Sequence, residues 1–141
     1  MDELSRAISL AATAFSGKVD KAGKPYILHL IRVMMAVPDQ LKPAAVLHDI
    51  IEDCSEYSLH HLYNKGFSKR TVETIHCLTH RINESYEQYI ARVSFKVDAI
   101  KIKIADLEDN MDLSRLDNPT EQDFKRNEKY LKCYNYLKTF L

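Results

Sequence analysis

The segment 44–53, AAVLHDIIED, brings imidazole and carboxylate side chains close together in the sequence. His48 and Asp49 are adjacent, and Glu52 and Asp53 follow about one helical turn later. On a helix of 3.6 residues per turn, His48 lies beside Glu52, and the two aspartates lie beside each other. Such groups on a half-buried face cost free energy unless something compensates them. A divalent cation would do so, and the segment therefore predicts a metal site.

Two further residues carry suitable donor atoms. His29 is expected on a helix that begins near Pro25, and Asp106 on a helix over 98–115. The complete mixed nitrogen and oxygen set is His29, His48, Asp49 and Asp106. This set suits Mn²⁺, Fe²⁺ or Zn²⁺ better than Ca²⁺. Taken singly, each residue also fits a role without metal: His29 as a core histidine, His48 and Asp49 as a hydrogen-bonded pair, and Asp106 as part of a solvated acidic run.

Three segments, in this order, resemble a known family: DKAGKPYILH (20–29), VLHDIIEDC (46–54) and KIADLEDNMDL (103–113). Together they resemble the HD-domain metal-dependent phosphohydrolases. Within that family they resemble the hydrolase domain of the Rel/Spo stringent-response enzymes and the small stand-alone HD proteins. The resemblance covers nearly the whole chain. It implies an all-α fold, a single HD-domain helical bundle over residues 1–141.

The resemblance also implies a role for each site residue. His29, His48, Asp49 and Asp106 would bind one divalent ion, by analogy Mn²⁺. Glu52 and Asp53 would position the attacking water and transfer protons. Lys21 at the pocket mouth and Asn110, one turn after Asp106, would bind the substrate, a small phosphorylated nucleotide. The implied activity is metal-dependent hydrolysis of a phosphate or pyrophosphate ester, similar to that of a guanosine 3′,5′-bis(diphosphate) 3′-pyrophosphohydrolase.

Two positions depart from the Rel/Spo pattern. Asp20 stands where that pattern has an arginine, and Leu113 where it has a threonine. In the family these positions help to hold the guanosine, and Asp20 would repel a phosphate, so the substrate stays open. The alternative is a non-catalytic HD module that binds metal or nucleotide and acts as a sensor or a partner-binding domain. The chain has no room for the family's synthetase domain and is not expected to make (p)ppGpp.

Composition favours one globular domain. The chain has 141 residues, of which 45% are hydrophobic and 28% charged, and its formal net charge is zero. Neither nucleic-acid nor membrane binding is therefore expected. The N-terminal segment lacks the basic start of a signal peptide. Cys54, Cys77 and Cys133 are odd in number and far apart, which favours reduced thiols and a cytoplasmic location.

The scarcity of glycine and proline predicts about seven helices and no sheet. Ile100, Ile102 and Ile104 alternate at strand period, but the helical stripe through Ile100, Ile104, Leu107 and Met111 favours a helix. The expected helices cover 3–16, from Pro25 to before Pro38, from Pro43 through the His-Asp pair, after Ser58, after Ser68, 84–95, 98–115, and from Glu121 onward.

Several polar residues are assigned no chemical role. Glu108, Asp109 and Asp112 are expected to be surface charges. His76 and His80 have the i, i+4 spacing of some zinc sites, but no acidic or thiolate partner accompanies them.

On the last helix, the stripe Tyr130, Tyr134, Leu137 and Leu141 is expected to dock on the core, and such an apolar helix could support a homodimer.

Overall fold

The computed structural model describes all of residues 1–141, and its regular elements are all helical. The α-helices are α1 (Glu3–Ala14), α2 (Ile27–Met35), α3 (Lys42–Val46), α4 (Ile50–Asp53), α5 (Leu59–Asn64), α6 (Lys69–Leu78), α7 (Tyr86–Val93), α8 (Val97–Met111) and α9 (Glu121–Lys138). Two 3₁₀ helices, η1 (Asp39–Leu41) and η2 (Leu113–Arg115), join them, and the only β-bridge pairs Val19 with Pro25. The predicted all-α class is confirmed.

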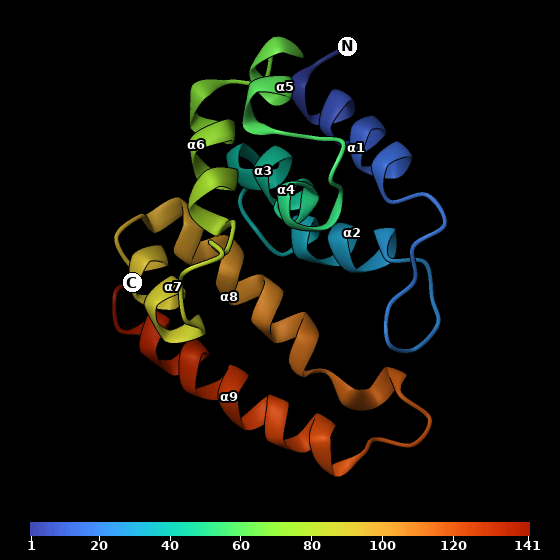
Figure 1. Cartoon of the computed structure of the whole chain (residues 1–141), viewed down its shortest axis with the longest axis vertical. Coiled ribbons are helices and arrows are strands. Elements are labelled where there is room, and N and C mark those ends of the chain that lie inside the picture. The colour runs from blue at the N-terminus through green and yellow to red at the C-terminus, as the bar shows by residue number, and fades with distance from the viewer.

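Helix α8 runs through the middle of the molecule (Figure 1). It packs against α2, α6, α7 and α9. Because it is covered on several sides, Ile100, Ile102 and Ile104 are all buried although they do not share one helical face. The helical interpretation of the alternating isoleucines is therefore correct.

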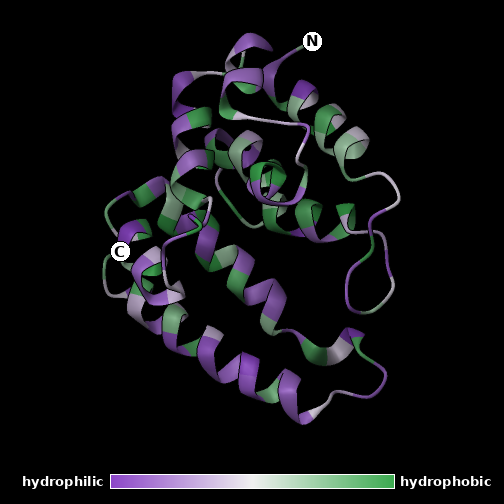
Figure 2. Ribbon diagram, viewed as in Figure 1, coloured by the Kyte–Doolittle hydropathy of each residue, from purple (hydrophilic) through white to green (hydrophobic).

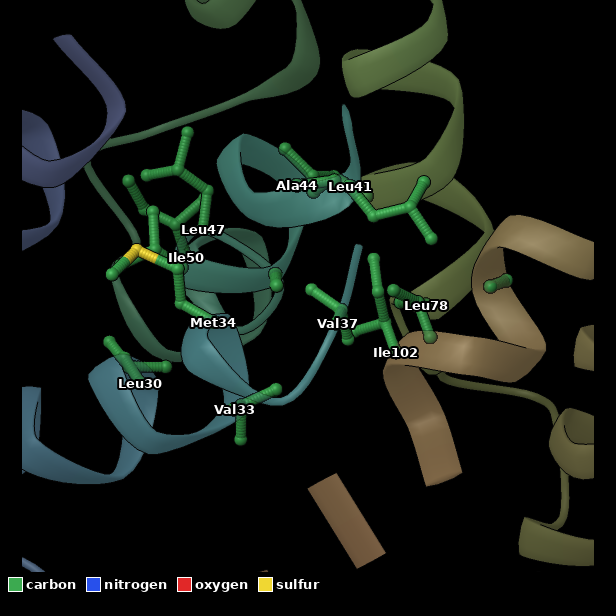
Figure 3. Packing of buried hydrophobic residues seen from close by; sticks show 14 of the residues in the cluster. Leu30, Val33, Met34, Val37, Leu41, Ala44, Leu47, Ile50, Leu78 and Ile102 are labelled. Atoms are coloured by element: carbon green, nitrogen blue, oxygen red, sulfur yellow. The ribbon is translucent and has the colours of Figure 1, made fainter. Parts of the chain in front are cut away.

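The hydrophobic core lies between α2, α3, α4, α6 and α8, where Leu30, Val33, Leu47, Ile50 and Ile102 are fully buried (Figure 3). This core fixes the elements that carry the candidate site. By contrast, α9 is largely hydrophilic along its length (Figure 2). Leu137 is its only fully buried residue, and Leu141 beyond its end is 59% exposed, so the predicted docking stripe is wrong at Leu141.

Polar caps define several helix ends as the sequence predicts. The Ser58 and Ser68 hydroxyl groups accept hydrogen bonds from the His61 and Thr71 backbone N–H groups and begin α5 and α6. Gly66 follows α5 with a φ of 84°, a conformation that glycine adopts without steric cost.

The single helix predicted from Pro43 through the His-Asp pair is wrong in one respect, because it is interrupted. The chain forms α3, then a tight turn over 47–49, then α4. In the turn, the backbone N–H groups of His48 and Ile50 bond to carbonyls only three residues back, at 3.3 and 3.0 Å. The His48 ring also bonds to the Ala45 carbonyl, and this local bond competes with regular helix.

Two expectations from composition concern the cysteines and the membrane. Cys54, Cys77 and Cys133 are free thiols in the structure. None of the helices has both the length and the apolar character that crossing a bilayer requires.

Candidate metal centre and adjoining pocket

The four predicted metal ligands come together from three parts of the chain. His29 lies on α2, His48 and Asp49 lie in the turn between α3 and α4, and Asp106 lies on α8. One donor atom from each of the four lies within 4.8 Å of the others. The two histidines and Asp106 are buried, whereas Asp49 is partly exposed. This group could hold a metal ion.

The distances between donor atoms fit a shared ion. Asp106 Oδ1 lies 2.9 Å from His29 Nε2 and 3.2 Å from His48 Nε2. Asp49 Oδ2 lies 3.2 Å from His48 Nε2 and 3.9 Å from His29 Nε2. Two ligands bound about 2.1 Å from one ion are separated by about 3.0 Å at right angles and about 3.4 Å at tetrahedral angles. These donor atoms are therefore close enough together that the group could hold one metal ion.

Hydrogen bonds to the second ring nitrogen orient both imidazoles. His48 Nδ1 lies 2.7 Å from the Ala45 carbonyl oxygen, which can only accept, so Nδ1 carries the proton. His29 Nδ1 lies 2.6 Å from Asp109 Oδ2 and donates to that carboxylate. In each ring the other nitrogen, Nε2, is then directed at the metal-ligand atoms of the other residues in the cluster. Metal-binding histidines usually have this arrangement.

Asp109 is not the surface charge that the sequence suggested. Its side chain is only 10% exposed, and it accepts hydrogen bonds from His29 and, at 2.6 and 3.1 Å, from the Arg32 guanidinium. Burial opposes its charge, but these donors outweigh burial and lower the pKa of Asp109 to about 2. The expectation failed because Arg32, its main partner, is 77 residues away in the sequence.

Protonation of His29 is favoured in the metal-free protein. Burial disfavours the imidazolium, but the hydrogen bonds to Asp106 and Asp109 outweigh burial and raise the pKa of His29 to about 9. The pKa of His48 is also raised, since burial is outweighed by the negative charges of Asp49 and Asp106. In the metal-free protein the His29 proton thus offsets part of the negative charge of the two carboxylates, and a metal ion would displace this proton.

Tyr26 is a further residue at the centre. Its hydroxyl group donates to Asp49 Oδ2 at 2.6 Å, and its ring stacks on Phe15 with centroids 5.3 Å apart. Burial and the charge of Asp49 raise the pKa of Tyr26, so the phenol remains a hydrogen-bond donor. Tyr26 therefore orients the most exposed of the four predicted ligands.

Asp106 receives further hydrogen bonds on α8 itself. Lys103 Nζ donates to Asp106 Oδ2 at 2.9 Å, and Asn110 Nδ2 donates to Oδ1 at 3.3 Å. Although burial opposes ionisation, the positive charges of Lys103 and His48 hold the pKa of Asp106 well below its usual range. The carboxylate is therefore charged and ready to act as a ligand.

Glu52 and Asp53 stand on α4 beside this cluster but are not part of it. The Glu52 carboxylate accepts the backbone N–H of His80, which ties it to the loop before α7. His80 is half-buried against Tyr89, with ring centroids 5.0 Å apart. Both residues are exposed, and partial desolvation together with the charge of Asp49 raises the pKa of both carboxyl groups.

A pocket of about 350 Å³ opens next to the cluster, between the turn over 18–26 and the N-terminal part of α9. His29 and Tyr26 line its inner end. Its charged and amide side chains are Asp20, Lys21, Asn110, Asp112, Arg115, Asp123, Arg126 and Asn127. Lys21 and Asn110 thus line this pocket together with Arg115 and Arg126. Burial and the nearby charge of Arg126 lower the pKa of Lys21.

Comparison with protein-family models and with curated proteins finds no match for this chain. The resemblance of the three segments to HD phosphohydrolases is therefore a prediction, and the geometry of the site is the basis for inferring what the protein does.

Proposed function

We propose that this protein is a metal-dependent phosphohydrolase that acts on a small phosphorylated nucleotide. The observation that carries the proposal is the junction of two features: four buried or half-buried metal-ligand side chains and a pocket with cationic side chains. His29 belongs to both, because its ring contributes to the cluster and lines the pocket. A phosphate group bound at the His29 end of that pocket would therefore lie next to the four-residue cluster.

His29, His48, Asp49 and Asp106 would hold one divalent ion, for which Mn²⁺ is the first choice and Fe²⁺ or Zn²⁺ the next. Such an ion, when bound, supplies Lewis acidity toward a phosphoryl oxygen and makes water more acidic. Hydrogen bonds from neighbouring residues would keep two of these ligands in place. Asp109 would orient the His29 ring, and Tyr26 would orient the Asp49 carboxylate.

Glu52 and Asp53 would act as general bases that accept the proton of the attacking water. A general base works best when its pKa approaches the working pH. Partial desolvation and the Asp49 charge move the pKa of both carboxyl groups in that direction. The backbone N–H of His80 fixes Glu52 in position. The Lys18 ammonium group, which donates to the Asp53 backbone carbonyl at 2.7 Å, ties the turn over 18–26 to the end of α4.

The pocket supports a nucleotide-sized ligand. Its volume of about 350 Å³ lies within the usual range for small-molecule sites. Lys21, Arg115 and Arg126 can donate charge-assisted hydrogen bonds to phosphate oxygens, which would compete with the pairing of Arg115 to Asp112 at 3.5 Å and of Arg126 to Asp123 at 3.3 Å. Asn110 and Asn127 offer amide groups that can pair with a sugar or a base. The carboxylate of Asp20 in the same pocket disfavours a highly charged phosphate at that end.

The test is an assay of phosphate and pyrophosphate release by the Mn²⁺-loaded protein from ppGpp, pppGpp, NADPH, NTPs and dNTPs. The Asp49→Ala variant is the blank, and Glu56→Ala, an exposed acidic change on the loop after α4, is the matched control. We expect turnover of at least one nucleotide by the wild type and Glu56→Ala, and none by Asp49→Ala. Equal turnover by Asp49→Ala would refute the proposal. Binding of Mn²⁺ and nucleotide without turnover would favour the non-catalytic sensor.

A further inference from the structure

Lys103 on α8 is a buried lysine three residues before the predicted ligand Asp106. Its residue exposure is 9%, and its ammonium group donates to Asp106 Oδ2 at 2.9 Å. The other carboxylate oxygen, Oδ1, is the one that faces His29 and His48. The two oxygens of Asp106 are thus divided between the ammonium group and the metal-ligand cluster.

Two tyrosine rings on α7 surround the ammonium group. Lys103 Nζ lies 5.1 Å from the Tyr89 ring centroid and 5.8 Å from that of Tyr86, both within range of a cation–π interaction. The Tyr89 hydroxyl donates to the Leu78 carbonyl at 2.7 Å, which fixes its ring. The rings of Tyr86 and Tyr89 also contact each other, with centroids 5.7 Å apart. The ammonium group therefore lies within cation–π range of two rings as well as within hydrogen-bond distance of Asp106.

An ordinary stabilising role does not account for this arrangement. A buried ion pair gains little over apolar residues of similar volume, because both charges must leave water. A helix could gain the same i, i+3 pairing at its surface without aromatic rings around the cation. What the buried pair adds is a fixed orientation of one carboxylate, whose second oxygen faces two imidazoles.

We propose that Lys103 is a positioning residue for the metal site: it occupies Asp106 Oδ2, so that Asp106 presents Oδ1 alone toward His29 and His48. Tyr86 and Tyr89 hold Lys103 in the position this requires. The inference rests on the metal-binding part of the proposed function and does not depend on hydrolysis.

The experiment measures metal binding without substrate. Metal-free wild type, Lys103→Met and Lys101→Met are titrated calorimetrically with Mn²⁺, and with Co²⁺ while the visible absorption bands are recorded. Lys101 is the matched control because it lies on the same helix but is exposed. We expect Lys103→Met to bind Mn²⁺ about 10- to 100-fold more weakly, the usual effect of losing a residue that orients a ligand. Its Co²⁺ bands should also change, since Asp106 is then free to bind through both oxygens. Lys101→Met should match the wild type.

Circular dichroism and thermal unfolding show whether each variant is folded. A second variant, Tyr86→Leu, removes one of the two tyrosine rings beside the Lys103 ammonium group. It leaves the Lys103–Asp106 pair intact. We expect it to weaken Mn²⁺ binding by roughly 2- to 10-fold, as the loss of one cation–π contact would. Its control is Lys129→Met, because the Lys129 ammonium group lies 3.9 Å from the same ring but makes no contact with Asp106.

The outcomes separate this inference from the proposed function. Wild-type affinity and an unchanged Co²⁺ spectrum in folded Lys103→Met would overturn the role of Lys103 while leaving the metal site in place. If Lys103→Met does not fold, an unchanged affinity in Tyr86→Leu would overturn it. Weakened binding in both variants, in a protein that hydrolyses no nucleotide, would support Lys103 and refute the hydrolase. A wild type that binds neither metal would overturn both.

Discussion

His29 Nδ1 lies 2.6 Å from Asp109 Oδ2, so a carboxylate on α8 orients a predicted metal ligand on α2. Arg32, one turn after His29 on α2, donates to the same carboxylate at 2.6 Å and anchors it. The pair links α2 to α8 beside the cluster. The site is therefore held by a second layer of polar contacts outside the four ligands.

Removing the charge of Asp109 tests this layer. Asp109→Asn is expected to weaken Mn²⁺ binding about 10- to 100-fold, because a neutral amide with one accepting oxygen replaces the charged carboxylate, both of whose oxygens accept hydrogen bonds from His29 and Arg32. Calorimetric titration of the metal-free protein measures the affinity. Glu108→Gln is the control, since Glu108 is exposed on the same helix. Equal affinities in the two variants would show that Asp109 only links α2 to α8.

Metal binding is expected to depend on pH through His29. Because the pKa of His29 rises from 6.5 to about 9 on folding, its proton stabilises the metal-free protein fully below pH 6.5. This contribution is lost as the pH rises through 9. Mn²⁺ requires the neutral ring, so its affinity should increase by up to about tenfold per pH unit over that interval.

Thermal unfolding with and without Mn²⁺ measures this dependence. The increase in Tm caused by the metal should grow from pH 6.5 to 9, and His48 should act in the same direction because its pKa is also raised. In Asp109→Asn the growth should end at a lower pH, since a neutral amide oxygen raises the pKa of His29 less than the Asp109 carboxylate does. An increase in Tm that is constant over the whole interval would contradict the prediction.

A matched pair of isoleucines tests the packing that supports the site. Ile102 on α8 is fully buried, whereas Ile82 in the loop before α7 is fully exposed. Ile102→Ala should lower the free energy of unfolding by about 2–5 kcal/mol, because it leaves a cavity in the core. Ile82→Ala should change it by less than about 0.5 kcal/mol. Urea unfolding of the metal-free protein gives both free energies. A similar loss of unfolding free energy in the two variants would contradict the prediction and would mean that Ile82 is packed in an interface with another chain.

The sequence predicted most of the fold because its signals are local. Ser58 and Ser68 mark the starts of two helices by their own hydrogen bonds, and the structure agrees at both. The break between α3 and α4 was missed because it depends on the His48 ring bonding to the Ala45 carbonyl. Pattern and propensity do not reveal a bond of this kind in a segment that otherwise suits a helix.

The site was predicted less completely for a related reason. The four predicted ligands could be named from residue type and resemblance. The supporting residues Tyr26, Asp109 and Lys103 could not, because their contacts depend on burial or on partners far away in the chain. Tyr26 reaches Asp49 across 23 residues, and the aromatic rings around Lys103 belong to another helix. In KIADLEDN the sequence offers several acidic residues, and only the packing of α2 against α8 selects Asp109 among them.

Proton handling by Glu52 can be separated from metal binding. Glu52→Gln keeps an oxygen that can accept the His80 backbone N–H, so the loop should stay in place while the base is lost. On the nucleotide that the panel identifies, kcat should fall by about 10²- to 10⁴-fold, with Mn²⁺ affinity unchanged. Glu56→Gln should retain wild-type kcat. A loss of metal affinity equal to the loss of kcat would instead make Glu52 a structural residue.

Under the proposed function, Asp20 would repel a phosphate in the pocket, and the structural role of Asp20 determines which variant can test this. Its Oδ1 atom accepts hydrogen bonds from the backbone N–H groups of Ala22 and Lys24, at 2.9 and 3.0 Å, and so shapes the turn that carries Lys21. Asp20→Arg would introduce the cation found in the Rel/Spo pattern but would remove this turn. Asp20→Asn keeps an accepting oxygen and removes only the negative charge.

We therefore expect Asp20→Asn to lower KM for a phosphorylated nucleotide by roughly fivefold at low salt, about what one partly screened charge contributes. kcat should be unchanged, and the gain should shrink as salt is added because screening weakens the repulsion in the wild type. Asp20→Arg should gain less than its charge alone would give, with a lower Tm that reports the loosened turn. If Asp20→Asn instead raises KM at every salt concentration, the carboxylate accepts a hydrogen bond from the substrate, and the preferred nucleotide has a donor group at that position.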